Sequence, residues 1–241
     1  MFENFSDVVV QNHKARDPGK VVAALEAQGV RAVVMTDTTD YYRGSDRSLK
    51  YLGLVRNYYR CLTADTAGPW QMVVQDDVHI PEGAIARMQH VLGFVSPDAP
   101  VSFYHPTNKS HIEAWEQGKH VLTTRANFWI QCFCMPKTLA VGMIEWADKT
   151  VSYGSAPEDA ILAAYLTMRK IYTRTVLPAF VQHEGYADSV LGHSPKVGKY
   201  DRLSMTYDPT FAVESVDWES EFADPYCDSM TGRLQDKWLV G

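Results

Sequence analysis

Residues 7–35, DVVVQNHKARDPGKVVAALEAQGVRAVVM, decide the fold class. Residues 7–10 form a short apolar run that is typical of a buried strand, and residues 30–35 form a second one. Between these runs, Asp17 and Pro18 predict the start of a helix, with Asp17 as its N-cap and Pro18 at its first position. A strand, a helix and a second strand joined by short connections predict a βαβ unit and a parallel sheet.

The same alternation continues toward the C-terminus. Apolar residues at helical spacing predict helices that begin near Ser45, Pro81 and Pro157, with Ser45 as an N-cap. Further strands are predicted at residues 70–74, 101–104, 127–135 and 173–181. We therefore predict an α/β fold in which helices flank a Rossmann-like, mostly parallel central sheet.

The composition changes near the C-terminal end of the last predicted strand. Residues 1–185 are predicted to form the core of the domain. In residues 186–241, Gly, Pro, Ser and Asp become frequent and periodicity weakens. This stretch has too few apolar residues for a core of its own, so we expect a loop-rich subregion, a lid or acceptor site, within the same domain.

The overall charge and the cysteines limit the class of protein. A net charge of -6 argues against broad electrostatic binding to nucleic acid or to an anionic membrane. The N-terminus lacks the features of a signal peptide, and no apolar run approaches the ~20 residues that span a bilayer. Cys61, Cys132, Cys134 and Cys227 lack the paired spacing of a zinc site and are expected to be free thiols. These features predict a cytoplasmic protein without membrane insertion.

The sequence Val-Val-Gln-Asp-Asp-Val at residues 73–78 places two carboxylates at the end of a buried strand. Ligands of open α/β sheets bind beyond the carboxyl ends of the strands. Two adjacent buried carboxylates need a cation or hydrogen-bond donors, and their oxygens suit Mg²⁺ or Mn²⁺. The alternative is a cap for the helix near Pro81, although a cap requires only one carboxylate.

Two other stretches carry candidate functional residues. His183 directly follows the last predicted strand, where it is either a metal ligand or a hydrogen-bonded structural histidine. Glu158 and Asp159 lie at the N-terminus of a predicted helix. Carboxylates in this position either cap the helix or act on a substrate.

Together these three stretches resemble glycosyltransferases of the GT-A fold over roughly residues 7–192. They are similar to the lipopolysaccharide-type family, in which a strand ends in an Asp-Asp pair, and to N-acetylglucosaminyltransferases with a Pro-x-x-x-Gln-His sequence. The resemblance implies a GT-A-like fold in which Asp77 and His183 hold Mn²⁺ or Mg²⁺. Asp76 would face the ribose or share the metal. Asp159, or otherwise Glu158, would be the catalytic base.

One position departs from the family pattern, since Gln75 stands where the D-x-D motif begins with an acid. An amide still bonds a ribose hydroxyl. Asn12, Thr36 and Asp37 follow the first two strands and are candidates for binding the nucleoside, with an Asx-type turn at Asp37 as the alternative. The candidate for contacting the diphosphate is Arg56.

The predicted function is the transfer of a hexosyl or N-acetylhexosaminyl group from a nucleoside-diphosphate sugar, with UDP as the expected nucleotide. The acceptor would be a hydroxyl of a glycan, a protein or a hydroxymethylated DNA base. DNA modification would resemble small virus-encoded glycosyltransferases, which act in the cytoplasm of a bacterial host. One alternative is a nucleotidyltransferase, for which Gly19-Lys20 is a poor phosphate loop, and the other is a non-catalytic nucleotide-sugar-binding module.

Overall fold

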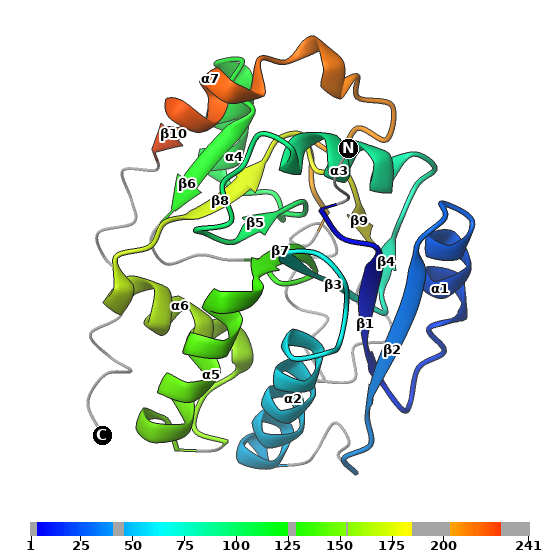
Figure 1. The fold of residues 1–241 in the computed structure, drawn as a ribbon, viewed down its shortest axis with the longest axis vertical. Helices are drawn as coiled ribbons and strands as arrows, with labels where there is room; N and C mark the ends of the chain where they lie inside the picture. The colour runs from blue at the N-terminus through cyan, green and yellow to red at the C-terminus, as the bar shows by residue number, and fades with distance from the viewer. Residues whose placement is uncertain (1–3, 41–45, 125–128, 153, 185–202, 228–241) are drawn as a thin grey trace.

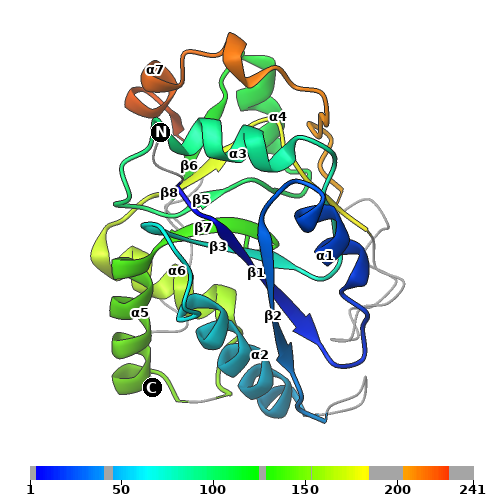
Figure 2. The same cartoon turned by 45° about the vertical axis from the view of Figure 1, so that its right-hand side comes forward.

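The computed structural model describes residues 4–40, 46–124, 129–152, 154–184 and 203–227 of the 241-residue chain. Within these ranges the chain forms one eight-stranded sheet and one two-stranded sheet, with helices on both faces of the larger sheet (Figure 1 and Figure 2). The α/β class predicted from the sequence is confirmed.

The large sheet is mostly parallel. Its strands lie in the order β10 (Tyr226–Cys227), β6 (Val121–Thr124), β8 (Thr173–Val176), β5 (Val101–Ser102), β7 (Cys132–Pro136), β3 (Trp70–Gln75), β1 (Asp7–His13) and β2 (Arg31–Asp37). Strand β1 is parallel to β2 and to β3, and β5 is parallel to β8. Strand β7 runs antiparallel to both β3 and β5, and β6 runs antiparallel to β8. Strands β1, β2, β3, β5 and β8 therefore share one direction.

The helices divide between the two faces of this sheet. They are α1 (Gly19–Glu26), α2 (Arg47–Leu62), α3 (Ala84–Leu92), α4 (Lys109–Glu116), α5 (Lys137–Thr150), α6 (Glu158–Arg169) and α7 (Trp218–Ala223), with a 3-10 turn η1 (Val213–Ser215). Val8 and Val10 face the core beneath α1 and α3, whereas Val9 faces α2, α5 and α6. This alternation buries β1 on both sides, as expected for a central parallel strand.

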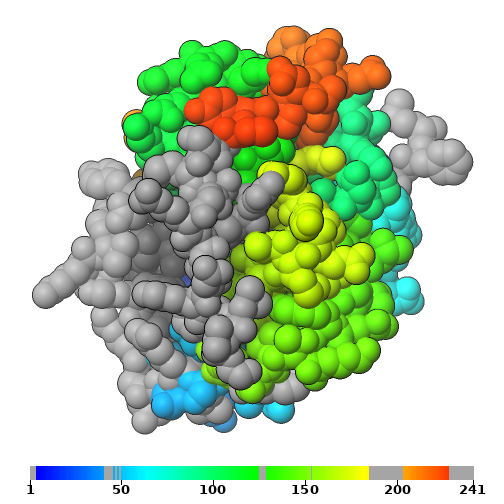
Figure 3. Space-filling view, turned by 90° about the vertical axis from the view of Figure 1, so that its left-hand side faces the viewer, coloured from blue at the N-terminus to red at the C-terminus, as the bar shows by residue number. Residues whose placement is uncertain are grey.

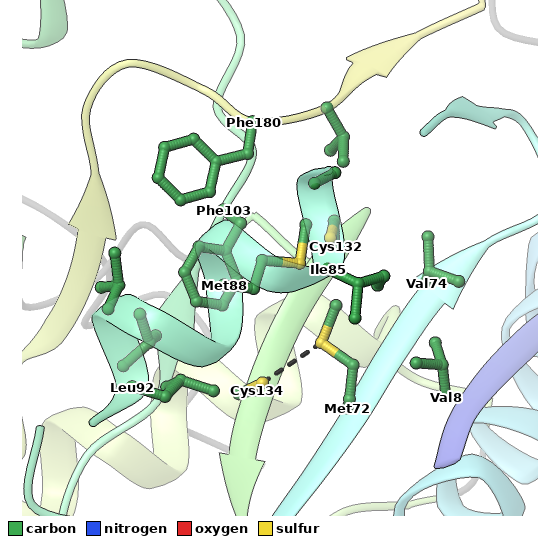
Figure 4. Packing of buried hydrophobic residues seen from close by; sticks show 14 of the residues in the cluster. Val8, Met72, Val74, Ile85, Met88, Leu92, Phe103, Cys132, Cys134 and Phe180 are labelled. Atoms are coloured by element: carbon green, nitrogen blue, oxygen red, sulfur yellow. Dashed lines mark hydrogen bonds between the residues drawn. The ribbon is translucent and has the colours of Figure 1, made fainter. Parts of the chain in front are cut away.

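The two cysteines of β7 pack in the hydrophobic core beneath α3 (Figure 4). Cys132 and Cys134 point into the same cluster as Val8 and Met88, and Cys134 Sγ lies 3.1 Å from Met72 Sδ. Burial raises the pKa of both thiols, so they are un-ionised core residues. All four cysteines are free thiols, which confirms that prediction.

Several boundaries differ from the predicted ones. Helix α1 begins at Gly19, whose N–H donates to Asp17 Oδ1 at 2.9 Å, one residue later than predicted. The cap of α2 is Asp46, which accepts from the N–H of Ser48 at 2.7 Å, and Ser45 lies outside the described residues. The predicted strand over 173–181 ends at Val176, before Pro178, which has no N–H for a strand ladder. The sequence analysis did not predict α4, β6 or α5.

Residues 203–227 pack against the end of the sheet that carries α4 and β6. Trp218 is fully buried, and β10 extends the sheet by pairing in parallel with β6. Figure 3 shows this orange and red segment lying directly on the green segment that contains α4 and β6. The described part of the C-terminal subregion thus continues the core of the sheet. No helix in the described ranges is long and apolar enough to cross a membrane.

Candidate functional site

The candidate site lies at the carboxyl ends of β1, β2 and β3, which are neighbours in the sheet. The register pairs Asn12 of β1 with Thr36 of β2, and Gln11 of β1 with Gln75 of β3. Because the three strands are parallel, the residues that follow them meet at one edge. Asp76 follows β3 directly, and its N–H donates to the carbonyl oxygen of Gln11 at 3.1 Å.

Arg16, in the connection between β1 and α1, joins the two carboxylates. Its Nη1 donates to Asp76 Oδ1 at 2.6 Å and to Asp77 Oδ2 at 2.7 Å. The backbone N–H of His13 donates to the other oxygen of Asp76 at 3.1 Å. Sequence analysis missed Arg16 and His13. His13 ends β1 and Arg16 follows it in the next connection, and this position at the predicted edge of the aspartate pair was the available signal.

His183 is brought to Asp77 by a small antiparallel sheet of β4 (Val78–His79) and β9 (Gln182–His183). Val78 lies opposite His183 in this pair, and the N–H of Glu184 donates to the carbonyl oxygen of Asp77 at 2.8 Å. His183 Nε2 consequently lies 3.2 Å from Asp77 Oδ2. The structure thus brings into contact the two residues that the sequence nominated as metal ligands.

The two carboxylates titrate differently because their surroundings differ. Burial and the adjacent charge of Asp77 raise the pKa of Asp76 above its usual value, and Arg16 offsets only part of this. Burial also acts to raise the pKa of Asp77, but His183 and Arg16 outweigh it and hold that pKa well below its usual value. Asp77 is thus the more firmly ionised of the two carboxylates.

Asn12, Thr36 and Asp37 are close together at the ends of β1 and β2. Asn12 Nδ2 donates to Thr36 Oγ1 at 3.3 Å. Asp37 Oδ1 accepts from the N–H of Thr39 at 2.9 Å, which forms the Asx-type turn considered as the alternative. The second carboxylate oxygen, Asp37 Oδ2, is buried without a hydrogen-bond partner among the described residues.

On α2, Asn57 approaches the strands, and Arg56 does not. Asn57 Nδ2 donates to the carbonyl oxygens of Asn12 and Met35 at 3.1 Å and 2.9 Å. Arg56 is exposed, because successive helical residues point about 100° apart around the helix axis. Arg56, the candidate for contacting the diphosphate, therefore lies on the exposed side of α2, and Asn57 holds the buried position facing the strands.

Glu158 and Asp159 are in contrasting environments at the N-terminus of α6. Glu158 is buried, and burial together with the charges of Asp159 and Asp37 raises its pKa to about 8. Asp159 is exposed, and its Oδ1 accepts from the N–H of Ala160 at 2.7 Å. The structure thus places Glu158 near Asp37, inside the protein, and leaves Asp159 accessible from solvent.

Buried oxygen atoms without a hydrogen-bond partner gather at this edge within the described part of the chain. They are Gln11 Oε1, Asn12 Oδ1, Asp37 Oδ2, Asn57 Oδ1, Asp77 Oδ1 and Glu158 Oε2. An unpaired buried polar group costs about 1–3 kcal/mol, so a concentration of them requires a reason. Acceptors of this kind suit a ligand with several hydroxyl or N–H groups.

Asp77 and His183 have the chemistry of ligands for a divalent cation. Asp77 Oδ1 is buried without a hydrogen-bond partner among the described residues, and His183 Nε2 lies near the second oxygen of the same carboxylate. Carboxylate oxygen and imidazole nitrogen both bind Mn²⁺. In the described ranges no three His, Cys, Asp or Glu side chains form a metal-binding group, so Asp77 and His183 are the two candidate ligands that these ranges offer.

Comparison with known proteins gives little further information. No family model and no curated protein matches the sequence. Among solved structures, the chain is similar to a mutant of Drosophila β-1,4-galactosyltransferase 7 in complex with manganese, UDP-Gal and xylobiose. The identity is 13% and the TM-score 0.34, and the match covers 84% of this chain and 71% of that chain. At this identity and TM-score the similarity is too low to support an argument about function.

Proposed function

We propose that the protein is a metal-dependent glycosyltransferase with a GT-A-like fold that uses a nucleoside-diphosphate sugar, with UDP as the nucleotide. The observation that carries this proposal is the convergence of Asp77, His183 and Arg16 at the carboxyl ends of three parallel strands. This edge holds carboxylates, the guanidinium of Arg16 and buried acceptors without a hydrogen-bond partner among the described residues. These groups suit a metal ion, a diphosphate and a nucleoside, respectively.

Each part of the donor has candidate partners in this arrangement. Asp77 and His183 would hold Mn²⁺ or Mg²⁺, which as a Lewis acid stabilises the departing diphosphate. Asp76 and Gln75 would bond the ribose. The remaining acceptors at the ends of β1 and β2 would receive hydrogen bonds from the nucleoside. They belong to Asn12, Thr36 and Asp37.

The acceptor hydroxyl needs a base, and the structure favours Asp159 over Glu158 for this role. With a pKa of about 8, Glu158 is mostly protonated at neutral pH and is a poor proton acceptor. Asp159 is exposed and so is open to an acceptor from solvent. In the proposed reaction Asp159 accepts the hydroxyl proton, the hydroxyl oxygen bonds to the anomeric carbon, and the bond from that carbon to the diphosphate breaks. The configuration of the sugar is inverted.

The donor site is tested by thermal unfolding with UDP, with Mn²⁺, with both and with neither. At concentrations one hundred times Kd we expect stabilisation of about 2.7 kcal/mol, or roughly 5–10 °C, when both are present. Asp77→Ala should abolish this shift. Asp7→Ala is the matched control, because Asp7 is a buried aspartate that pairs with Arg31 at the opposite end of β1.

Absence of any shift with UDP or another nucleoside diphosphate in the unchanged protein would contradict the proposal. The aspartate pair would then serve only to join the β1–α1 connection to the end of β3. An equal shift in Asp77→Ala and in the unchanged protein would show binding elsewhere in the molecule.

A further inference from the structure

Arg16 contacts both carboxylates of the candidate site through a single nitrogen atom. Its Nη1 lies 2.6 Å from Asp76 Oδ1 and 2.7 Å from Asp77 Oδ2. The side chains are largely shielded from solvent, with exposed fractions of 18% for Arg16, 6% for Asp76 and 17% for Asp77. Screening by water is weak in such surroundings, so the guanidinium strongly affects any other cation nearby.

The same carboxylate is the candidate ligand for the divalent cation. Asp77 Oδ2 accepts from Arg16 and also lies 3.2 Å from His183 Nε2. A divalent cation held by Asp77 and His183 would stand beside the positive charge of Arg16. Two cations close together in a shielded site repel one another, so each lowers the affinity of the site for the other.

We propose that Arg16 competes with the divalent cation for Asp77 and moves its hydrogen bonds to the donor's diphosphate when the cation binds. This inference rests on the proposed function. A guanidinium matches the geometry of phosphate oxygens and binds them with two parallel hydrogen bonds. Cation and nucleotide then bind cooperatively, because the nucleotide removes the competitor that weakens cation binding on its own.

The surroundings of Arg16 allow this exchange of partners. Asp76 keeps a donor when Arg16 leaves, because the backbone N–H of His13 bonds its second oxygen at 3.1 Å. The backbone of Arg16 is itself held, since its N–H donates to the carbonyl oxygen of His13 at 2.9 Å. Only the side chain has to move, and an arginine side chain has several rotatable bonds.

The test is calorimetric titration of the whole protein with Mn²⁺, in the absence and in the presence of saturating UDP. For Arg16→Gln we expect the Kd for Mn²⁺ without UDP to fall about tenfold, within the usual range of coupling between sites. The ratio of the two Kd values, without and with UDP, should fall by a similar factor. Arg31→Gln is the matched control. Arg31 pairs with Asp7 at the opposite end of β1 and β2, so this substitution should change neither the Kd for Mn²⁺ nor the Kd ratio.

Arg16→Lys provides a second variant in case the glutamine variant does not fold. Its ammonium keeps the charge and cannot form two parallel hydrogen bonds, so we expect a Kd ratio between those of the unchanged protein and Arg16→Gln. Equal Kd ratios in the unchanged protein and in every Arg16 variant that folds would overturn the role of Arg16 and leave the donor site intact. Failure of the unchanged protein to bind either Mn²⁺ or UDP would overturn the proposed function itself.

Discussion

Glu158 is a buried carboxyl group whose pKa lies far above its value in water. It is buried at the start of α6, and its pKa is raised from 4.5 to about 8. A carboxyl with a raised pKa stabilises the fold fully below its unfolded pKa, and this contribution is lost as the pH rises through its folded pKa. The free energy of unfolding should therefore fall between pH 4.5 and pH 8 because of this residue.

Glu158→Gln should remove this dependence on pH. An amide resembles the protonated acid in shape and carries no charge, so the variant should be more stable than the unchanged protein at pH 8, on the order of a few kcal/mol. Urea unfolding of both proteins at pH 5 and pH 8 measures the effect. Glu145→Gln, at an exposed position of α5, is the control and should leave the dependence on pH unchanged. Equal stability of both proteins at pH 8 would show that Glu158 is not protonated in the fold.

At the residue scale, sequence reasoning identified Asp77 and His183 and missed Arg16. The aspartate pair was predictable because two adjacent carboxylates directly after a buried strand are unusual. Arg16 lies 60 residues from Asp76 in the sequence, and its place after β1 was the available sign that it reaches the same edge. Only the placement of β1 directly beside β3 shows that the connection after β1 reaches the aspartates.

Among the elements, His105 in the connection from β5 to α4 stacks on His111 of α4. The rings of His105 and His111 are 4.1 Å apart and almost parallel, and His105 Nε2 lies 2.9 Å from Thr206 Oγ1. Burial lowers the pKa of His105 to about 4 and, with the nearby His105, that of His111 to about 2. Such groups stabilise the fold above their unfolded pKa of 6.5, and the contribution is lost as the pH falls below it.

His111→Phe should therefore reduce the loss of stability in mild acid. Phenylalanine keeps a buried ring and cannot be protonated, so we expect the decrease in unfolding free energy from pH 7 to pH 5 to be about 2 kcal/mol smaller than in the unchanged protein. Urea unfolding at the two pH values measures this difference. His79→Phe, at an exposed position of β4, is the control and should leave the decrease unchanged. An unaltered decrease in His111→Phe would contradict the expectation.

Some elements were predictable and others were not. Helix α5 buries Ala140, Met143 and Ala147 at helical spacing, so its pattern was present in the sequence and was missed. Strand β6 has four residues, too few for periodicity to distinguish it from a loop. Strand β9 was not predicted, because its two residues directly follow the strand predicted over residues 173–181.

At the scale of the whole molecule, residues 203–227 close one end of the sheet through Trp218 and Glu221. Trp218 is fully buried, and its Nε1 donates to the carbonyl oxygen of Val213 at 2.7 Å. Glu221 Oε2 accepts from the N–H groups of His120 and Val121 at 2.7 Å and 3.1 Å. The two hydrogen bonds of Glu221 join the C-terminal segment to the start of β6.

Trp218→Ala should destabilise the protein by about 3–5 kcal/mol, because it removes a large buried ring and leaves a cavity. Chemical denaturation measures the loss. Phe94→Ala, at an exposed position, should cost much less. Affinity for UDP in the folded variant should stay unchanged, since Trp218 lies at the other end of the sheet from β1 and β2. A loss below 1 kcal/mol would show that the segment is not part of the main core.

The sequence predicted the first half of the sheet better than the second. The βαβ unit of β1, α1 and β2 contains its own evidence, since a helix between two strands is the crossover that parallel neighbours need. The insertion of β7 between β3 and β5, antiparallel to both, depends on pairings between distant segments. The local pattern of Cys132 and Phe133 shows only that the strand is buried on both faces, and it contains no information on direction.

The pairing of β4 with β9 has a consequence for how the molecule matures. Asp77 and His183 are far apart in the chain and become neighbours only through this small antiparallel pair. Closing such a long loop is entropically costly, so β9 should dock late, after β1, β2 and β3 have assembled. Affinity for the cation would then arise at the last step of folding. If Asp77 and His183 hold the proposed cation, an incompletely folded chain would lack the complete site, and cation binding would report that assembly is complete.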